Sequence, residues 1–564
     1  MDRRKFFKIL VAAAGGIGGA YLLLRSDLSG TESTTVTTTV TEVITKGPEQ
    51  VVSVWRDPSL NGYPHSSKTP YGPDESRVYG AVVGALKQLN PNSDNPLADI
   101  ISPGDTVALK PNLVSPWNFG DSSCTHTSIY RPIIDYAIKA GARKVTICEG
   151  PADGDEKDEM FGAKYTNISK FVDQMKELHP DVEIGWVNAN KDGFIWFPLH
   201  SDSELWGVFS EDELFTDRGR SLKRDSYYYA EDSLGYNPKG YKVGLYAVAE
   251  SVVKSDVLVN LPKMKTHNIA GATLSLKNLI GITPSATGGR SVGEDPVEDD
   301  PAKDLPHFST PPPHWNGDIL ANQNSFENDA LWRVIADLNK IALYGGGDGK
   351  LHQERQRRYL SVVDGIVAME GNGPVNGKRR PMGTIVAGYD PVVVDTVCCR
   401  IMGYDHHFIR AVSKQSTVRN HPIGTSNPNR VCVVGVELNK ETFGASFLPH
   451  CNYNDSKISP YSLNLTRFDV LSSLKSISIR PERPKEDNPA QIVAEVSEAE
   501  SLSSAWLRLD IDGGMFLLLM SRQGESLLGS IPRTRSGVQI RYSICLMDAL
   551  FNTHWSEEKV VVVQ

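Results

Sequence analysis

The order of apolar segments within residues 106–148 constrains the fold of this chain more than any other feature. A short apolar run, Thr106–Leu109, is followed by apolar residues at helical spacing over positions 129–137, and Lys144–Cys148 is a second apolar run. Gly141 follows the helical pattern at a C-cap position. A strand, a helix and a strand in this order predict a βαβ unit, whose strands are parallel and whose sheet is covered on both faces.

The same alternation recurs later in the chain. Strands are predicted at Asp256–Leu261, Ser361–Val363 and Thr384–Ala387, each as a short apolar run. A helix is predicted after Asp390-Pro391, because Asp suits the N-cap and Pro suits the first helical position. We therefore predict an α/β fold with a mostly parallel sheet and covering helices.

Polar side chains follow these predicted strands at the point where each strand ends. In open α/β sheets, ligands bind beyond the carboxyl ends of the strands. Several separate segments of this chain therefore converge on one predicted ligand site. Their polar residues are Lys110, Asn112, Glu149, Lys263, Lys265, Thr266, His267, Asp364, Glu370 and Asp390.

Four lysines are the main candidates for binding an anion. Lys263 and Lys265 lie two residues apart, so in an extended segment their side chains point to the same side. Together with Lys110 and Lys277 they could form a cationic pocket for a phosphate or a carboxylate. The alternative is a set of lysines that face solvent after their strands.

Asn112 and Asn278 complete the predicted anion site, although an Asn in a turn often serves only its own backbone. His267 and Glu370 are the catalytic candidates. His267 could be a general acid or base, a metal ligand or a hydrogen-bonded structural histidine. Glu370 precedes a glycine-punctuated turn and could be a base, a metal ligand or part of the turn. The cofactor is therefore left unknown, with a metal ion as one option.

Five segments of the chain resemble the domain of unknown function 362 family. Its most specific motifs are the Leu-Pro-Lys-x-Lys-Thr-His block at 261–267 and the Glu-Gly-Asn-Gly-Pro block at 370–374. The resemblance implies an α/β domain, sometimes fused to iron–sulfur ferredoxin modules, with no settled activity. The seven cysteines form no Cys-x-x-Cys motif, so a redox role would need a separate iron–sulfur partner. The segments are 107–114, 125–150, 257–281, 361–377 and 389–403.

The N-terminus resembles a twin-arginine export signal. Arg3-Arg4 stands just before the apolar run Ile9–Leu24, although an ordinary secretory signal has similar features. No small-x-small cleavage site is evident, so residues 1–26 are expected either to be removed or to stay as a membrane anchor. The Thr-rich segment 27–48 predicts an extended stalk. We therefore expect an extracytoplasmic protein on the cell surface or in a periplasm-like space.

The end of the chain has a different pattern. Residues 481–489 are charged and Pro-rich, which predicts a linker. Beyond it, Ala505–Ile511 and Val538–Leu546 alternate apolar and polar residues, which predicts short strands of a small β-sandwich. This part resembles immunoglobulin-like modules of exported microbial proteins. The α/β domain is then expected at 49–480 and the immunoglobulin-like module at 490–564.

The net charge of the chain limits the partners that it is expected to bind. A net charge of −9 and no long basic run argue against nucleic acid as a partner. We expect an exported protein that binds, and in one interpretation transforms, a small anionic molecule. One alternative is a surface-displayed binding or adhesion protein without catalysis, and another is a redox accessory protein that works with an iron–sulfur partner.

Overall fold

The structure is a computed structural model, and it describes two compact units. The α/β unit comprises Gln50–Val470 and Met547–His554, and the β unit comprises Leu471–Leu546 and Trp555–Gln564. The predicted signal and stalk lie outside the described residues. No helix in the described ranges is long and apolar enough to cross a membrane. Those ranges are 49–114, 116, 119–151, 158–204, 245–283, 331–450, 473–486, 488 and 490–564.

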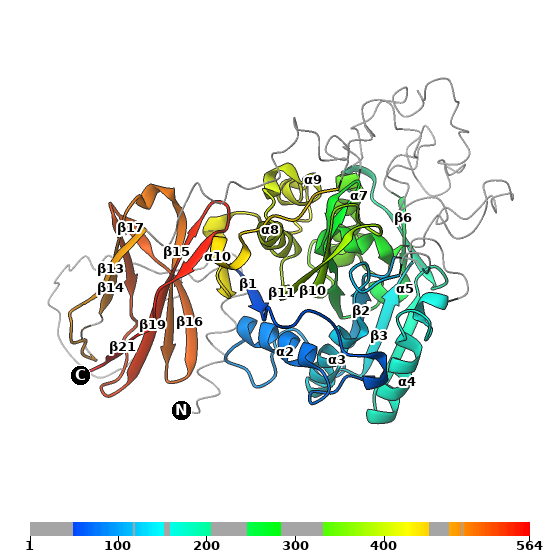
Figure 1. Cartoon of the computed structure of the whole chain (residues 1–564), viewed down its shortest axis with the longest axis horizontal. Helices are drawn as coiled ribbons and strands as arrows, with labels where there is room; N and C mark the ends of the chain where they lie inside the picture. The colour runs from blue at the N-terminus through cyan, green and yellow to red at the C-terminus, as the bar shows by residue number, and fades with distance from the viewer. Residues whose placement is uncertain are drawn as a thin grey trace, which may run out of the picture. The chain divides into compact units, whose positions relative to one another are not determined.

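One large sheet forms the centre of the α/β unit (Figure 1), with the strand order β12-β1-β11-β10-β7-β2-β3-β4. Strands β10, β7, β2, β3 and β4 run parallel, and β1 is parallel to β12. Strand β11 is antiparallel to both of its neighbours. The predicted α/β class with a mostly parallel sheet is confirmed. The bounds are β1 Gln50–Arg56, β2 Thr106–Pro111, β3 Lys144–Glu149, β4 Glu183–Asn188, β7 Val257–Leu261, β10 Arg358–Glu370, β11 Lys378–Gly388 and β12 Val431–Gly435.

Two short strands extend this sheet beside β10. After Pro262 the chain continues as β8 (Lys263–His267), which is parallel to β10. It then turns back as β9 (Gly271–Thr273), which is antiparallel to β8. A separate antiparallel pair is formed by β5 (Phe194–Pro198) and β6 (Leu245–Ala249).

Helices cover both faces of the large sheet, as parallel strands require. One buried core joins α2, α3 and α4 to alternate residues of the strands, such as Leu109 and Val259. The other core joins α7 and α8 to residues that point the opposite way, such as Ala108 and Leu258. The bounds are α2 Arg77–Leu89, α3 Tyr130–Lys139, α4 Ile168–Leu178, α5 Glu250–Val253, α6 Ser275–Asn278, α7 Leu331–Tyr344, α8 Pro391–Met402, α9 Arg410–Ser413 and α10 Lys440–Phe443.

The predicted helix ends are confirmed at α3 and α8. Gly141, just past α3, has a φ of +97°, a conformation that glycine adopts without strain. Asp390 is the N-cap of α8 and accepts hydrogen bonds from the backbone N–H groups of Val392 and Val393. Gly403 ends α8 in the left-handed region.

The β unit contains two antiparallel sheets. One has the order β13-β14-β18-β17, and the other contains β16-β15-β19 with β21 beside β19. A side chain at Gly529 would clash with Leu507, so the two sheets face each other at close range. The predicted strands of the C-terminal part are confirmed, their pairing is antiparallel, and the immunoglobulin-like assignment stays a prediction. The bounds are β13 Leu474–Arg480, β14 Gln491–Val496, β15 Leu502–Ile511, β16 Gly514–Leu519, β17 Ser521–Gln523, β18 Ser526–Ser530, β19 Gln539–Asp548, β20 Thr553–Trp555 and β21 Lys559–Val562.

Candidate functional site

The four predicted lysines lie at the edge of the sheet where β2, β3 and β7 end. Lys110 is at the end of β2, Lys263 and Lys265 are on β8, and Lys277 is in α6. The first three are buried and Lys277 is partly exposed. Lys265 interacts electrostatically with Lys263 and Lys277, and Lys277 with Lys110, so the four form one lysine cluster.

Lys110 is held in a buried ion pair with Glu149, at the end of β3. Its Nζ lies 2.8 Å from Oε2 of Glu149 and also donates to the carbonyl of Pro111 at 2.7 Å. Backbone N–H groups of Leu113 and Gly150 donate to the same carboxylate. Burial raises the pKa of Glu149 to about 7, against the opposing effect of Lys110, and lowers the pKa of Lys110.

Lys263 is held in a second buried ion pair, with Asp364 of β10. Its Nζ lies 3.0 Å from Oδ2 of Asp364, and both side chains are fully buried. Tyr63 donates its hydroxyl to Oδ1 of Asp364 at 2.6 Å, accepts a hydrogen bond from Lys263 and stacks on His126. Burial lowers the pKa of His126 to about 4, so this ring is neutral at pH 7.

Lys265 is buried without an acidic partner among the described residues. Its Nζ donates to the backbone carbonyl of Ser123 at 2.6 Å. Burial, with the nearby ammonium groups of Lys277 and Lys263, lowers the pKa of Lys265 to about 7. Thr273 lies directly opposite Lys265 on β9, and its buried hydroxyl has no hydrogen-bond partner among the described residues. Directly opposite residues project from the same face of a β pair, so the two side chains leave the sheet on the same side.

Lys277 is the second lysine that no described carboxylate contacts. No hydrogen bond or ion pair of its Nζ is formed within the described part of the chain. Burial and the positive charge of Lys110 lower its pKa to about 8, while Glu149 opposes this shift. The lysine cluster therefore contains two neutralised members and two with unbalanced charge.

The predicted asparagines form a buried ladder beside the cluster. Asn112 donates from Nδ2 to Oδ1 of Asn278 at 2.8 Å, and Asn278 donates to Oδ1 of Asn260 at 2.7 Å. Asn278 also donates to the backbone carbonyl of Lys110. Oδ1 of Asn112 is buried and has no hydrogen-bond partner in the part of the chain that the structure describes. The hydrogen bonds of the asparagines thus position the end of β2, and Oδ1 of Asn112 is left as an available acceptor.

His267 lies at the end of β8 and is 7% exposed. Its Nδ1 accepts hydrogen bonds from the backbone N–H groups of Ile269 at 3.0 Å and Ala270 at 3.1 Å. An accepting Nδ1 carries no proton, so the neutral ring is protonated at Nε2. This ring stabilises the turn between β8 and β9, and a catalytic role for it stays a prediction.

Glu370, at the end of β10, is committed to contacts outside the lysine cluster. Its Oε2 accepts hydrogen bonds from the guanidinium group of Arg380 and, at 3.1 Å, from the backbone N–H of Leu448. A base or a metal ligand at this position would have to give up the ion pair. The structure therefore does not bring Glu370 to the two unbalanced lysines, and its catalytic role also stays a prediction.

Three residues of this region were not among the predicted site residues. Tyr63 lies in a segment without strand or helix pattern, so no sequence signal points to it. Asn260 is a polar residue inside the apolar run of β7, which is a signal that an alternation analysis can detect. Thr273 becomes a site candidate only because the register of β8 and β9 places it opposite Lys265.

Carboxylate and thiol groups elsewhere in the α/β unit serve the fold. Asp395 of α8 accepts hydrogen bonds from the backbone N–H groups of Ser275 and Leu276 at the start of α6. Burial raises its pKa to about 7. The cysteines in the described ranges are buried and form no disulfide with one another, and burial raises the pKa of Cys148 to about 12, so this thiol stays protonated.

Fold and site together define an α/β protein with lysines gathered at the carboxyl edge of a largely parallel sheet. The family described as Domain of unknown function (DUF362) matches residues 225–400. The thylakoid-associated protein sll1697 of Synechocystis sp. is 22% identical over 331 residues, which are 58% of this chain and 72% of that protein. The crystal structure of a Br derivative of BhCBM56 covers 16% of this chain and 92% of its own, at 14% identity and a TM-score of 0.14.

Proposed function

We propose that the α/β unit binds a small phosphate- or carboxylate-bearing molecule between Lys265 and Lys277. One observation carries this proposal: two lysines of the cluster have carboxylate partners, whereas no described carboxylate contacts the other two. A buried or half-buried ammonium group without a counter-charge is costly, and an anionic ligand removes that cost. A site of this kind is expected to be unfavourable when empty and favourable when occupied.

Neighbouring groups are suited to the same ligand. The hydroxyl of Thr273 stands opposite Lys265 without a partner and can donate a hydrogen bond to a ligand oxygen. Oδ1 of Asn112 is an unused acceptor for a ligand hydroxyl or a protonated ligand oxygen. Charge-assisted bonds from the two lysines supply most of the affinity, and the neutral groups supply orientation.

Lys265 also has the property that a general base needs. Its pKa of about 7 leaves a large fraction of the amine unprotonated near neutral pH. A lysine with this pKa could accept a proton from a bound substrate, whereas Lys277, with a pKa of about 8, stays mostly protonated at pH 7. Transfer of a proton from a bound substrate to Nζ of Lys265 would therefore generate the ammonium group that binds the resulting anion together with Lys277.

The test is calorimetric titration of the full-length chain with inorganic phosphate and, separately, with citrate. We expect one of the two probes to bind and Lys277→Met to weaken its affinity by about 10-fold or more, since hydrogen bonds to charged groups contribute about 1.5–3 kcal/mol. Thr273→Val should weaken the same probe less. Lys170→Met is the matched control, because Lys170 is an exposed lysine of α4. Binding of neither probe, or unchanged affinity in Lys277→Met, contradicts the proposal.

We also propose that the protein works at a membrane outside the cytoplasm. The support is the signal-like sequence at 1–26 and the name of the thylakoid-associated relative. Fractionation of cells that express the full chain tests this: the wild type should sediment with membranes, and an Arg3→Lys, Arg4→Lys variant should accumulate in the cytoplasm. Equal distribution of both proteins would contradict the export route.

A further inference from the structure

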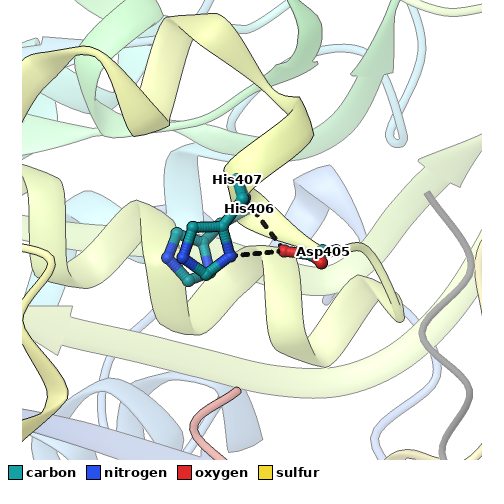
Figure 2. Close-up of side chains that lie close together, drawn as sticks. All are labelled: Asp405, His406 and His407. Carbon is teal, nitrogen blue, oxygen red and sulfur yellow. Dashed lines mark hydrogen bonds and ion pairs between the residues drawn. The ribbon is translucent and has the colours of Figure 1, made fainter. Parts of the chain in front are cut away.

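Outside the lysine cluster, three consecutive side chains gather between α8 and α9. Asp405, His406 and His407 each offer one ligand atom, and these atoms lie within 4.8 Å of one another. Figure 2 shows the two imidazole rings side by side with the carboxylate of Asp405 at their edge. The ring centroids are 4.0 Å apart. Three metal-binding side chains therefore share one small region of the α/β unit.

The local backbone builds this arrangement. Asp405 is the N-cap of the short turn His406–Phe408 and accepts a hydrogen bond from the backbone N–H of His407 at 3.0 Å. The same oxygen lies 2.8 Å from Nδ1 of His407. Gly403, in the left-handed region, ends α8 just before this turn. Because the ligands are adjacent in sequence, little chain entropy is lost in bringing them together.

The surroundings of the His406 ring point to a ligand. His406 is 4% exposed, packs edge-on against Phe551, and its ring nitrogens have no hydrogen-bond partner among the described residues. Its ring nitrogens are not among the fully enclosed polar atoms, so the ring is held in place by packing while a nitrogen is available to a metal ion. The ring lies beside His407, whose side chain is 62% exposed, so the cluster is open to solvent on one side.

We propose that Asp405, His406 and His407 bind a divalent transition metal of the Zn²⁺ class. Two imidazoles and one carboxylate suit Zn²⁺, Ni²⁺, Co²⁺ and Cu²⁺, whereas Mg²⁺ and Ca²⁺ prefer all-oxygen sites. The metal replaces the hydrogen bond between Asp405 and His407. Three protein ligands leave a coordination position for water or for an external ligand. This proposal is independent of the anion site at the lysine cluster.

Two other histidine–carboxylate pairs serve for comparison with the three side chains of Asp405, His406 and His407. His352 lies 3.1 Å from Asp348, and His554 lies 3.1 Å from Glu437. Neither pair belongs to a group of three such ligand atoms within 4.8 Å of one another among the described residues. His352 is 42% exposed, so it provides a matched control for His407.

The test uses the full-length chain, freed of metal with a chelator and dialysed against Zn²⁺, with bound zinc measured by inorganic mass spectrometry. We expect one more zinc ion per chain in the wild type than in His407→Ala, and an affinity at least about 10-fold weaker in Asp405→Asn, a change as large as loss of an outer-shell partner causes. His352→Ala should bind as the wild type does. Equal zinc in the wild type and His407→Ala overturns the proposal.

Co²⁺ gives a second readout that does not depend on stoichiometry. Its visible absorption bands should form on titration of the wild type and of His352→Ala, and should be lost in His407→Ala. Because His407 is largely exposed, its truncation is expected to leave the melting temperature of the metal-free chain unchanged. Identical cobalt spectra in all three proteins would overturn the proposal.

Discussion

Lys263 and Lys265 lie two residues apart on β8, yet only Lys263 meets a carboxylate: its Nζ is 3.0 Å from Asp364, whereas Lys265 reaches only the carbonyl of Ser123. The same contrast separates Lys110, which pairs with Glu149, from Lys277. Two lysines are therefore paired with buried carboxylates, and two carry charge that no described carboxylate neutralises. Replacing a paired lysine should lower the stability of the protein. Replacing an unpaired lysine of the cluster should instead raise stability and weaken anion binding.

The first prediction concerns the buried pair of Lys110 and Glu149. Lys110→Met leaves the carboxylate of Glu149 buried without its counter-charge, so we expect the free energy of unfolding to fall by about 3–5 kcal/mol at pH 8. The loss should shrink as the pH falls toward 5, because Glu149 already has a raised pKa of about 7 and takes up a proton. Guanidinium denaturation at several pH values measures both effects.

A second variant checks the cause of that loss. Adding Glu149→Gln to Lys110→Met removes the charge that the first change left unpaired, so most of the stability should return. If the double variant is less stable than Lys110→Met, the pair is not acting through charge.

The second prediction concerns Lys265 and stability. Its pKa is about 7 in the folded protein and about 10.4 in an unfolded chain, so between these values the unfolded chain binds the extra proton. The resulting destabilisation is complete below pH 7 and disappears as the pH rises to about 10.4. Lys265→Met removes it, so we expect a gain of about 1–3 kcal/mol below pH 7 and none near pH 10.

Denaturation of the wild type and of Lys265→Met across this range measures the difference. A gain that is independent of pH would show that packing, and not the lysine charge, is responsible. The variant should at the same time bind the anion at least about 10-fold more weakly, because one of the two charged groups that hold the ligand is gone.

The third prediction is the pH dependence of anion binding. An anion favours the protonated forms of Lys265 and Lys277, whose pKa values are about 7 and 8 in the free protein. Affinity should therefore rise as the pH falls from 9 to 6 and level off below 6. Sulfate is the suitable probe, because its own charge is constant over this range. Lys265→Met should leave only the step near pH 8, and a flat profile in the wild type would contradict the assignment.

The local parts of this architecture could be predicted from the sequence. The strands at 106–111, 144–149 and 257–261 are mostly apolar, and polar residues stand at or near the carboxyl end of each strand. The pairing of those residues could not be predicted. Lys263 and Asp364 are separated by 101 positions and meet only because β8 lies beside β10.

Burial of the lysines was also beyond sequence reasoning. A lysine after a strand looks the same whether it faces solvent or lies under later segments, and here α6 and β9 cover this edge of the sheet. The contribution of Tyr63 depends on a segment without periodicity that reaches Asp364 across 301 positions. Long-range packing therefore decides which predicted site residues keep unbalanced charge.

The last prediction tests how closely the chain covers the buried pair. At Gly281, in the turn Leu279–Ile282, an added Cβ would lie 1.9 Å from Oε1 of Glu149 and 2.9 Å from Nζ of Lys110. The carboxylate of Glu149 is held by Lys110 at Oε2 and by the backbone N–H of Gly150 at Oε1. Gly281→Ala must therefore displace the turn or break these contacts, and we expect a loss of about 1–3 kcal/mol.

Gly80 in α2 is the matched control, because an added Cβ there meets nothing within 4 Å. Gly80→Ala should stabilise the protein by about 0.5–1 kcal/mol, since alanine restricts the unfolded chain and favours a helix. If guanidinium denaturation shows that Gly281→Ala destabilises the protein and Gly80→Ala stabilises it, the turn at Gly281 is packed tightly against the pair of Lys110 and Glu149. Equal signs would mean that the turn can move away, and the lysine cluster would then be less enclosed than its buried side chains indicate.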